Sequence, residues 1–300
     1  MKKILHTLIL SLVSIYSYAQ VQLYGLTAGG GVNGYGVGFQ WNPATNSYTK
    51  KIEFNGSNGR EPKGSLTESN GKLYGTTYYG GTNGTGNPPY YGYGVIFEWD
   101  PLTNIYTKKI DFADSIGFNP IATLTLKDGK FYGTTARGGG ANSDGAIFEW
   151  NPMTNIYTKK IEFDHSNLSG GFPISPLTLY SGKFYGITGY GGINNGGVIF
   201  EWDPVTNIYT KKVDFNGSNG DPHADEGTSL SLYLGKFYGV TGFGGINNGG
   251  VIFEWDPVTN IYTKKINFAT SNGTGGTISS NGSRPVGSLV LKGEDRKSVV

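Results

Sequence analysis

The chain has 300 residues, with 50 glycines, 14% aromatic residues, 15% charged residues, no cysteine and a formal net charge of +2. Glycine is unfavourable inside helices, whereas aromatic and β-branched residues suit pleated sheets, so this composition excludes a mainly helical protein. The weak charge argues against nucleic-acid partners, which require clustered Lys and Arg, and the lack of cysteine excludes disulfides and thiolate metal sites.

The first residues have the pattern of a secretory signal peptide. Lys2 and Lys3 form a basic start, residues 4–15 are mostly apolar, and residues 17–19 (Ser-Tyr-Ala) place small side chains where a signal peptidase reads them. The apolar stretch is shorter than the roughly 20 residues of a membrane span. We predict a signal peptide over residues 1–19 and a secreted or cell-surface mature chain without a transmembrane segment.

Five tandem repeats follow. Each contains a Leu/Phe-Tyr-Gly motif, and its tyrosines are Tyr24, Tyr74, Tyr132, Tyr185 and Tyr238. The tryptophans keep nearly the same spacing, at Trp41, Trp99, Trp150, Trp202 and Trp255. A period near 50 residues with four strand signals per unit is typical of β-propellers. We predict an all-β propeller of four-stranded blades over residues 20–293, with repeats at about 21–72, 73–130, 131–183, 184–236 and 237–293.

The fourth repeat shows the predicted elements of one blade. The expected strands are residues 175–179, 183–188, 198–202 and 208–215, with a glycine-rich loop at 189–197 and an Asp-Pro-Val-Thr-Asn hairpin at 203–207. Alternation along the third strand places Val198, Phe200 and Trp202 on one face. A single small sheet cannot cover this face, so we expect the neighbouring repeat to bury it.

The two ends of the mature chain suggest how the ring closes. The chain begins with a second-type strand, residues 21–25, and ends with a first-type strand, residues 287–291. We expect these strands to pair and complete blade one, because closure protects edge strands that would otherwise pair between molecules. The expected product is a monomer, and the alternative is an incomplete ring. Residues 294–300 break the repeat pattern, and we interpret them as a non-native tail of a truncated chain that naturally carries more repeats.

The repeat resembles the kelch repeat in its glycine doublet, Gly191-Gly192, followed by an aromatic-Asp-Pro-x-Thr turn at residues 202–206. More specifically, it resembles the GloVer tandem repeat of exported bacterial proteins, through the Leu-Tyr-Gly-Thr-Thr-x-x-Gly-Gly signature at residues 73–81 and the Phe-Asn-Gly linker at residues 54–62. The resemblance covers nearly all of residues 21–293, although Glu-Trp or Gln-Trp stands where Lys-Leu is common. It implies a propeller-like, extracellular or surface-anchored protein and no defined activity. The Tyr-Ala-Gln end of the signal peptide, residues 18–20, resembles that of exported Bacteroidota proteins.

The repeated charged residues are interpreted as structural. Glu98, Glu149, Glu201 and Glu254 occupy one repeat position, whereas paired catalytic acids need two different environments. Five Lys-Lys pairs recur from Lys50-Lys51 to Lys264-Lys265, and adjacent strand residues face opposite ways, so a solvated outer strand is favoured over a surface for anionic glycans.

No cofactor or metal site is predicted. The glycine-rich loops are not followed by a helix, as phosphate binding would need. The loop from Asp214 to Gly220, with Asp225 beyond it, only faintly resembles a calcium loop, and the equivalent loop in the first repeat lacks the final acid. His165 and His223 lie in unlike loops and do not indicate a metal site or a nucleophile–base pair.

The positions that vary between repeats are the candidate binding residues. Exposed aromatic loops on a rigid scaffold commonly bind sugars or proteins, although such rings can also simply pack against neighbouring loops. The residues before the glycine doublets and the insertion of the second repeat supply the candidates: Tyr79, Tyr90, Tyr91, Tyr93, Arg137, Tyr190 and Phe243.

Three functions remain open at this stage. The leading hypothesis is an exported, non-enzymatic scaffold whose loops bind an unidentified protein or polysaccharide. The alternatives are a glycan-active hydrolase or lyase with its site at the propeller mouth, and a structural or adhesive surface protein. An enzyme should show polar residues unique to one blade inside the channel, whereas a binder should show an aromatic patch on one rim.

Overall fold

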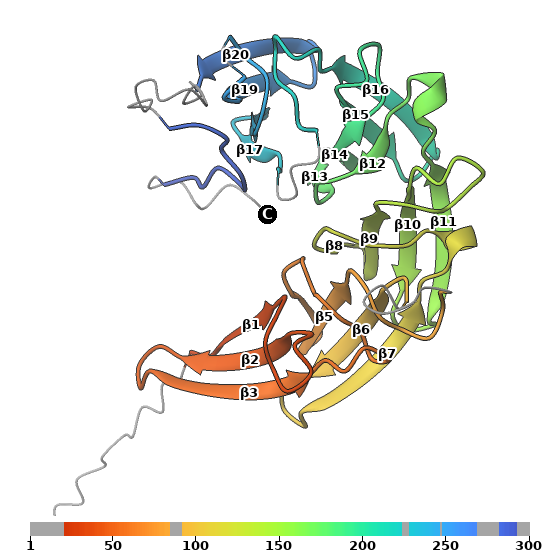
Figure 1. Ribbon diagram of the computed structural model, residues 1–300, viewed down its shortest axis with the longest axis vertical. Helices are drawn as coiled ribbons and strands as arrows, with labels where there is room; N and C mark the ends of the chain where they lie inside the picture. Colours follow the sequence, from red (N-terminus) through yellow and green to blue (C-terminus); the bar gives the residue numbers. More distant parts are fainter. Residues whose placement is uncertain (1–20, 85–91, 224–227, 247, 269–281, 293–300) are drawn as a thin grey trace, which may run out of the picture.

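The computed structural model describes residues 21–84, 92–223, 228–246, 248–268 and 282–292. In these residues the chain forms strands and two single-turn 3-10 helices, η1 (Asp114–Ile116) and η2 (His165–Asn167). The strands make five antiparallel sheets that follow one another along an arc (Figure 1), so the predicted all-β propeller architecture is confirmed. No helix in the described ranges has the length and apolar character of a membrane span.

Each sheet is one blade. Blade 1 has three strands, β1 (Leu23–Thr27), β2 (Val37–Asn42) and β3 (Ser47–Glu53). Blade 2 consists of β4 (Thr67–Ser69), β5 (Lys72–Thr77), β6 (Val95–Asp100) and β7 (Ile105–Asp111), and blade 3 of β8 (Thr125–Lys127), β9 (Lys130–Thr135), β10 (Ala146–Asn151) and β11 (Ile156–Glu162). Blade 4 comprises β12 (Gly171–Pro173), β13 (Thr178–Tyr180), β14 (Lys183–Tyr190), β15 (Val198–Asp203) and β16 (Ile208–Asp214). Blade 5 contains β17 (Ser231–Tyr233), β18 (Lys236–Thr241), β19 (Val251–Asp256) and β20 (Ile261–Asn267).

Blade 4 shows how closely local sequence dictates the strands. Three of its four predicted strands match β14, β15 and β16 within two residues. The first strand starts later than predicted, at Thr178, because Ser175 meets β14 through its side chain: its Oγ accepts a hydrogen bond from the Ile187 amide at 2.8 Å. Asp203 Oδ1 accepts hydrogen bonds from the amides of Val205 and Thr206, as the hairpin prediction required.

The glycine of the Tyr-Gly motif has a steric role. Gly186 lies opposite Phe200 in the β14–β15 ladder, and a Cβ at this position would stand 2.5 Å from Phe200 Cζ. The same pairing recurs in every blade, from Gly25 with Phe39 to Gly239 with Phe253. Only glycine therefore leaves room for the phenylalanine ring to lie flat across the neighbouring strand.

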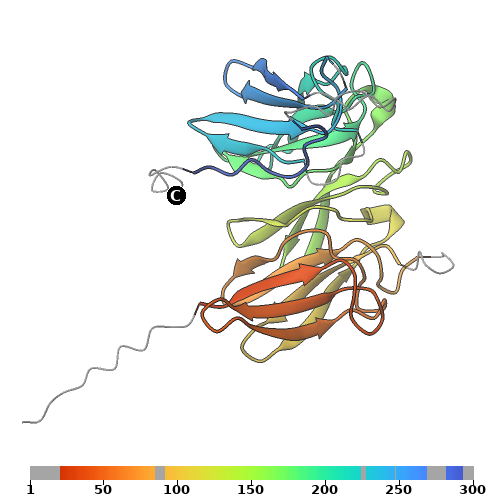
Figure 2. The same ribbon diagram turned by 60° about the vertical axis from the view of Figure 1, so that its left-hand side comes forward.

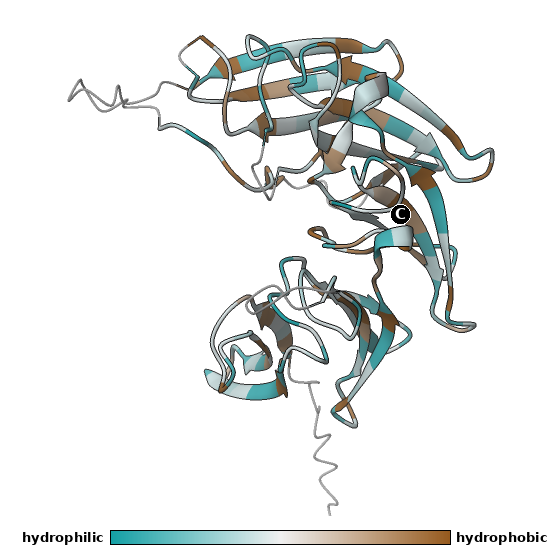
Figure 3. Ribbon diagram, turned by 45° about the vertical axis from the view of Figure 1, so that its right-hand side comes forward, coloured by the Kyte–Doolittle hydropathy of each residue, from teal (hydrophilic) through white to brown (hydrophobic). Residues whose placement is uncertain are grey.

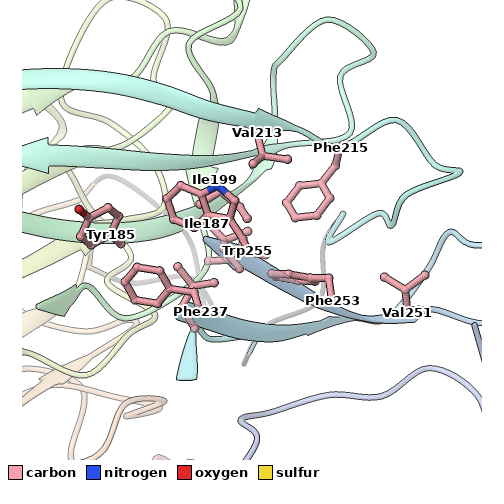
Figure 4. Packing of buried hydrophobic residues seen from close by; sticks show 11 residues of the cluster. Tyr185, Ile187, Ile199, Val213, Phe215, Phe237, Val251, Phe253 and Trp255 are labelled. Carbon is pink, nitrogen blue, oxygen red and sulfur yellow. The ribbon is translucent and has the colours of Figure 1, made fainter. Parts of the chain in front are cut away.

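The core lies between blades. Hydrophobic and hydrophilic residues alternate along the strands (Figure 3), and buried clusters join each of blades 1 to 4 to the blade that follows it. At the junction of blades 4 and 5, Tyr185 contacts Trp255 with ring centroids 5.7 Å apart, and Phe237 stacks on the same indole at 5.5 Å (Figure 4). The predicted burial by neighbouring repeats is confirmed for four tryptophans, which have no exposed surface: Trp99, Trp150, Trp202 and Trp255.

Within the described residues the arc of blades does not close. β1 pairs only with β2, and the sheets of blades 1 and 5 stand apart in both views (Figures 1 and 2). Residues 287–291 are not a strand; they lie beside blade 5, where Ser231 Oγ donates a hydrogen bond to the Leu289 carbonyl at 2.7 Å. Their predicted pairing with residues 21–25 is therefore wrong, because hydrogen bonds from Ser229 and Ser231 hold Ser288 and Leu289 against blade 5. Trp41 of blade 1 is partly exposed.

Candidate functional site: the aromatic and cationic rim

The variable residues of the repeats gather at one end of the blades, on the loops that connect each second strand to its third. Each of these loops is held by the linker from the preceding blade. Backbone bridges join Arg60 to Tyr79, Phe118 to Arg137, and Asp221 to Phe243. In blade 4 the same role falls to β12, whose Gly171 pairs with Tyr190. We call this end of the molecule the rim.

A guanidinium lies between two tyrosines where blade 1 meets blade 2. The Arg60 guanidinium carbon is 4.6 Å from the ring centroid of Tyr35 and 5.8 Å from that of Tyr79. Its charge is balanced by Glu61 at 2.7 Å. Lys63 adds a second cation 3.8 Å over the ring of Tyr78. Flat rings and cations are thus interleaved at this junction.

At the next junction a ring of blade 2 packs on the linker residue whose backbone is bridged to Arg137. Tyr93 packs on Phe118 with centroids 4.5 Å apart. Tyr90 and Tyr91, the other candidates of the second-repeat insertion, lie outside the described residues.

The junction of blades 3 and 4 holds a small pocket of about 240 Å³. Its lining includes Arg137, whose guanidinium is 5.3 Å from the ring centroid of Phe172, and Tyr190, which meets the same phenylalanine edge-on at 5.6 Å. Tyr190 also contacts His223, with ring centroids 4.2 Å apart. Phe172 has a φ of 54°, a left-handed conformation that is strained for an aromatic residue. The equivalent linker residues Glu61 and Asn119 have the same conformation, so it is a feature of the repeat.

A histidine–aspartate pair forms one wall of this pocket. His165 Nδ1 lies 2.6 Å from Asp144 Oδ2, and the same oxygen accepts a hydrogen bond from the His165 amide at 2.9 Å. The His165 side chain remains about half exposed. The pocket thus offers a cation, a polar pair and two rings within a space suited to a small group.

Blade 5 also has a cation packed over an aromatic ring. Arg284, on the segment after the last blade, lies 4.2 Å over the ring of Phe243. Five predicted binding residues therefore lie on the rim, each packed against a residue of the neighbouring linker: Tyr79, Tyr93, Arg137, Tyr190 and Phe243. The structure spreads them over successive junctions and does not bring them into one cluster.

The linker partners were missed by sequence reasoning. Arg60, Phe172 and Arg284 stand in loops that were treated as connections, and only the packing of blades brings them onto the variable rings. A signal did exist for Asp144, because it replaces Tyr35 and Tyr93 of the first two repeats immediately before a glycine. Aligning the repeats by this glycine shows that blade 3 alone carries an acid there.

The repeated glutamates and lysines are paired with one another away from the rim. In blade 4, Glu201 accepts hydrogen bonds from Lys183 at 2.8 Å and Tyr185 at 3.0 Å and forms an ion pair with Lys212 at 3.2 Å. Burial alone raises the pKa of Glu201, but these donors outweigh it and hold the pKa below its ordinary value. Lys211, the other member of the Lys-Lys pair, pairs with Asp214 at 2.9 Å.

These ion pairs correct the prediction that the lysine pairs lie on a solvated outer strand. In blades 2 to 4 both lysines of each pair have acidic partners, as Lys108 with Asp111 and Lys109 with Glu98 illustrate. The opposite orientation of adjacent lysines agrees with the strand prediction. The ion pairs neutralise much of the charge that an anionic-glycan surface would use.

A second cavity, of about 580 Å³, lies on the inner side of the arc and is lined by residues from all five blades. Its lining combines small and apolar residues with one charged side chain, Lys63, and four hydroxyl side chains: Ser65, Thr123, Ser229 and Ser288. Paired-acid hydrolysis needs two carboxylates across the scissile bond. Among the described residues the lining supplies none.

A metal site was not predicted, and the part of the chain that the structure describes contains no group of three or more potential His, Asp or Glu ligands. In the weak calcium-loop candidate, Asn216 and Asn219 cap each other's backbone amides at 2.9 and 3.0 Å. Asp225, the acid that drew attention to this loop, lies outside the described residues.

Fold and site together define a β-propeller repeat protein with a variable rim. Residues 89–234 match the model of the Gloeobacter/Verrucomicrobia repeat, which confirms the resemblance seen in the sequence. Over this range the chain is similar to GloVer-type tandem repeat proteins. No curated protein matches it in sequence.

Solved structures resemble the chain in fold at low identity. TolB from Acinetobacter baumannii is 12% identical with a TM-score of 0.49, and the match covers 81% of this chain and 52% of TolB. A chain of the nidogen/laminin complex is 10% identical with a TM-score of 0.50, covering 79% of this chain and 73% of that one. One of two prolyl endopeptidases is 12% identical with a TM-score of 0.50, covering 81% and 33%. The chain thus spans about half of TolB and a third of the endopeptidase, and at these identities the likeness concerns the fold alone.

Proposed function

We propose that the protein is an exported, non-enzymatic scaffold whose rim binds a polysaccharide at or outside the cell surface. The observation that carries this proposal is the recurrence of aromatic rings, most of them beside a cation, at successive blade junctions on one end of the molecule. Flat rings give contact area at low entropic cost, and a rigid scaffold holds them in place. Export is supported by the signal-peptide pattern of residues 1–19.

The shape of the rim favours an extended ligand. Each junction offers one or two partly exposed rings and, at three junctions, an arginine, so a chain-like ligand could contact several junctions at once. Linked weak contacts of this kind raise overall affinity without a deep pocket. Hydroxyl-rich sugars match the arginine and His165–Asp144 groups through hydrogen bonds.

A glycan array probed with the mature chain tests the proposal. We expect binding to one polysaccharide class, and a loss of about tenfold or more when Arg137 and Tyr190 are both changed to Ala. Tyr233→Ala is the matched control, because this exposed tyrosine is the last residue of β17, at the opposite end of blade 5. Equal loss with the control, or binding only to proteins in a pull-down, would reject the rim as a polysaccharide site.

A further inference from the structure

The pocket between blades 3 and 4 is formed by three segments of the chain. Arg137 and Asp144 come from the loop after β9, His165 and Phe172 from the linker between the blades, and Tyr190 from the end of β14. Its volume of about 240 Å³ is below the roughly 300–1,000 Å³ of pockets that enclose a drug-sized ligand. The pocket therefore suits one unit of a sugar chain, with the rest of that chain lying outside it.

The charged groups of this pocket differ in whether they have partners. In the part of the chain that the structure describes, the Arg137 guanidinium lies over the Phe172 ring and has no acidic partner. Asp144, the one acid among the described lining residues, is already engaged, because its Oδ2 faces both the amide and the Nδ1 of His165. The Asp144 side chain is only 16% exposed, against 52% for His165. The pocket thus combines an unpaired cation with a shielded acid.

The junction of blades 1 and 2 shows how this protein supplies an acid to a similar arginine. Arg60 lies over the rings of Tyr35 and Tyr79, and its Nε and Nη2 both donate to Glu61 Oε1, at 2.9 and 2.7 Å. Glu61 and Phe172 are equivalent linker residues, because each directly precedes a proline and each has a left-handed backbone, with φ of 53° and 54°. At the junction of blades 3 and 4 a ring therefore takes the place of the acid, and the protein supplies the arginine without its carboxylate.

We propose that this pocket binds the carboxylate of one uronic acid unit in an acidic polysaccharide, an inference that rests on the proposed function of the rim and names its substrate class. Arg137 donates hydrogen bonds to the carboxylate, since a planar guanidinium matches its two oxygens. His165 contributes its second ring nitrogen to a sugar hydroxyl, because Nδ1 is taken by Asp144. The Tyr190 ring packs against the sugar ring.

A carboxylate fits this pocket better than an uncharged sugar group does. A guanidinium and a carboxylate can form two parallel hydrogen bonds, whereas a hydroxyl accepts singly and carries no charge. The lysine pairs of the blades do not compete for the acid, because lysines such as Lys211 and Lys212 already have Asp214 and Glu201 as partners. The net charge of the protein is only +2, so selection of an acidic sugar depends on a local site and not on general attraction.

Titration calorimetry of the mature chain with polyuronates tests the proposal. Polygalacturonate, polymannuronate and polyguluronate are each compared with their methyl esters, because esterification removes the charge and keeps the sugar backbone. We expect at least one acid to bind about tenfold or more tightly than its ester. Arg137→Gln should abolish this preference and leave the affinity for the ester unchanged, and Arg137 is exposed, so the variant keeps its fold. Lys51→Gln is the matched control for net charge, because Lys51 lies on β3, the edge strand of blade 1. Tyr190→Ala should weaken the binding of acid and ester by similar factors.

Four outcomes would overturn the inference. Equal binding of acid and ester would show that the pocket does not select the carboxylate, although the rim would still bind polysaccharide. Loss of the preference in Lys51→Gln as complete as in Arg137→Gln would indicate general attraction. Tighter binding of dextran sulfate than of every polyuronate would assign the pocket to sulfate esters. Binding of no polyuronate would also reject the inference, and the glycan array then shows separately whether the rim binds neutral polysaccharides.

Discussion

The blade junctions and the rim are built from the same repeats, but residues are repeated at the junctions and varied on the rim. At the junctions the same residues recur in nearly every copy, so Tyr185 on Trp255 is repeated as Tyr132 on Trp202. On the rim the equivalent positions differ, as Tyr79, Arg137 and Phe243 show. The difference teaches that the repeated residues specify how blades stack, whereas the varied residues are free to specify what the molecule contacts.

Removing the tryptophan side chain of an interior blade should have the largest effect on stability. Trp202→Ala empties a fully buried site and should lower the free energy of unfolding by about 3–5 kcal/mol. Trp41→Ala, at the same repeat position but partly exposed, should cost less than half as much in a monomeric preparation. Urea unfolding followed by circular dichroism measures both, and equal losses would show that Trp41 is covered in solution.

Adding a single methyl group at the Tyr-Gly motif should have the next largest effect. Gly186→Ala would push a Cβ into the Phe200 ring and should cost about 1–3 kcal/mol through overpacking. Gly29→Ala is the matched control on the rim side, because a Cβ there meets no atom within 4 Å. A destabilised control would mean that the cost is general to glycine replacement in this protein.

Loss of the hairpin asparagine should have a smaller effect. Asn207 has a φ of 58°, accepts a hydrogen bond from Trp202 Nε1 and donates one to the Lys160 carbonyl of blade 3. Asn207→Gly keeps the left-handed backbone but removes both bonds, and should cost about 1 kcal/mol. Asn46→Gly should cost less, because in the described chain Asn46 makes only the indole bond. Thermal unfolding of both variants compares an interior junction with the open end.

Acid should weaken the glutamate–lysine clusters that recur in the blades. Hydrogen bonds from Lys236 and Lys265 lower the pKa of Glu254 to about 2, and the equivalent glutamates are shifted in the same direction. A carboxyl with a lowered folded pKa stabilises the protein above its ordinary pKa, and this stability is lost as the pH falls toward the folded value. The melting temperature should therefore fall between about pH 4.5 and pH 2, and Glu254→Gln should flatten this dependence slightly. An unchanged slope in the variant would show that Glu254 does not contribute.

The smallest effect on stability is expected on the rim itself. Arg137 is exposed, and Arg137→Ala should change the free energy of unfolding by no more than about 0.5 kcal/mol. The same variant should weaken polysaccharide binding, as measured by titration calorimetry. A large loss of stability would show that Arg137 has a structural role, and would contradict the distinction between rim residues and junction residues.

Much of the fold followed from local sequence signals. The spacing of Tyr24, Tyr74 and their equivalents predicted the blades, and the alternation of Val198, Phe200 and Trp202 predicted the buried face. The Asp203 hairpin was predictable because its hydrogen bonds join residues two and three positions apart. Of the candidate site, the variable ring positions could be found by aligning the repeats, but their partners could not.

By itself, the sequence determined the repeat, the order of the strands within a blade and the tryptophan that each blade must bury. Only the tertiary structure decided that the arc stays open and that Phe172 meets both Arg137 and Tyr190 on the rim. The physical reason is the distance along the chain over which the interactions act. Strand and turn preferences depend on residues a few positions apart, whereas the curvature of the arc is the sum of small rotations at every blade junction. A small change in each rotation decides whether the first and last blades meet.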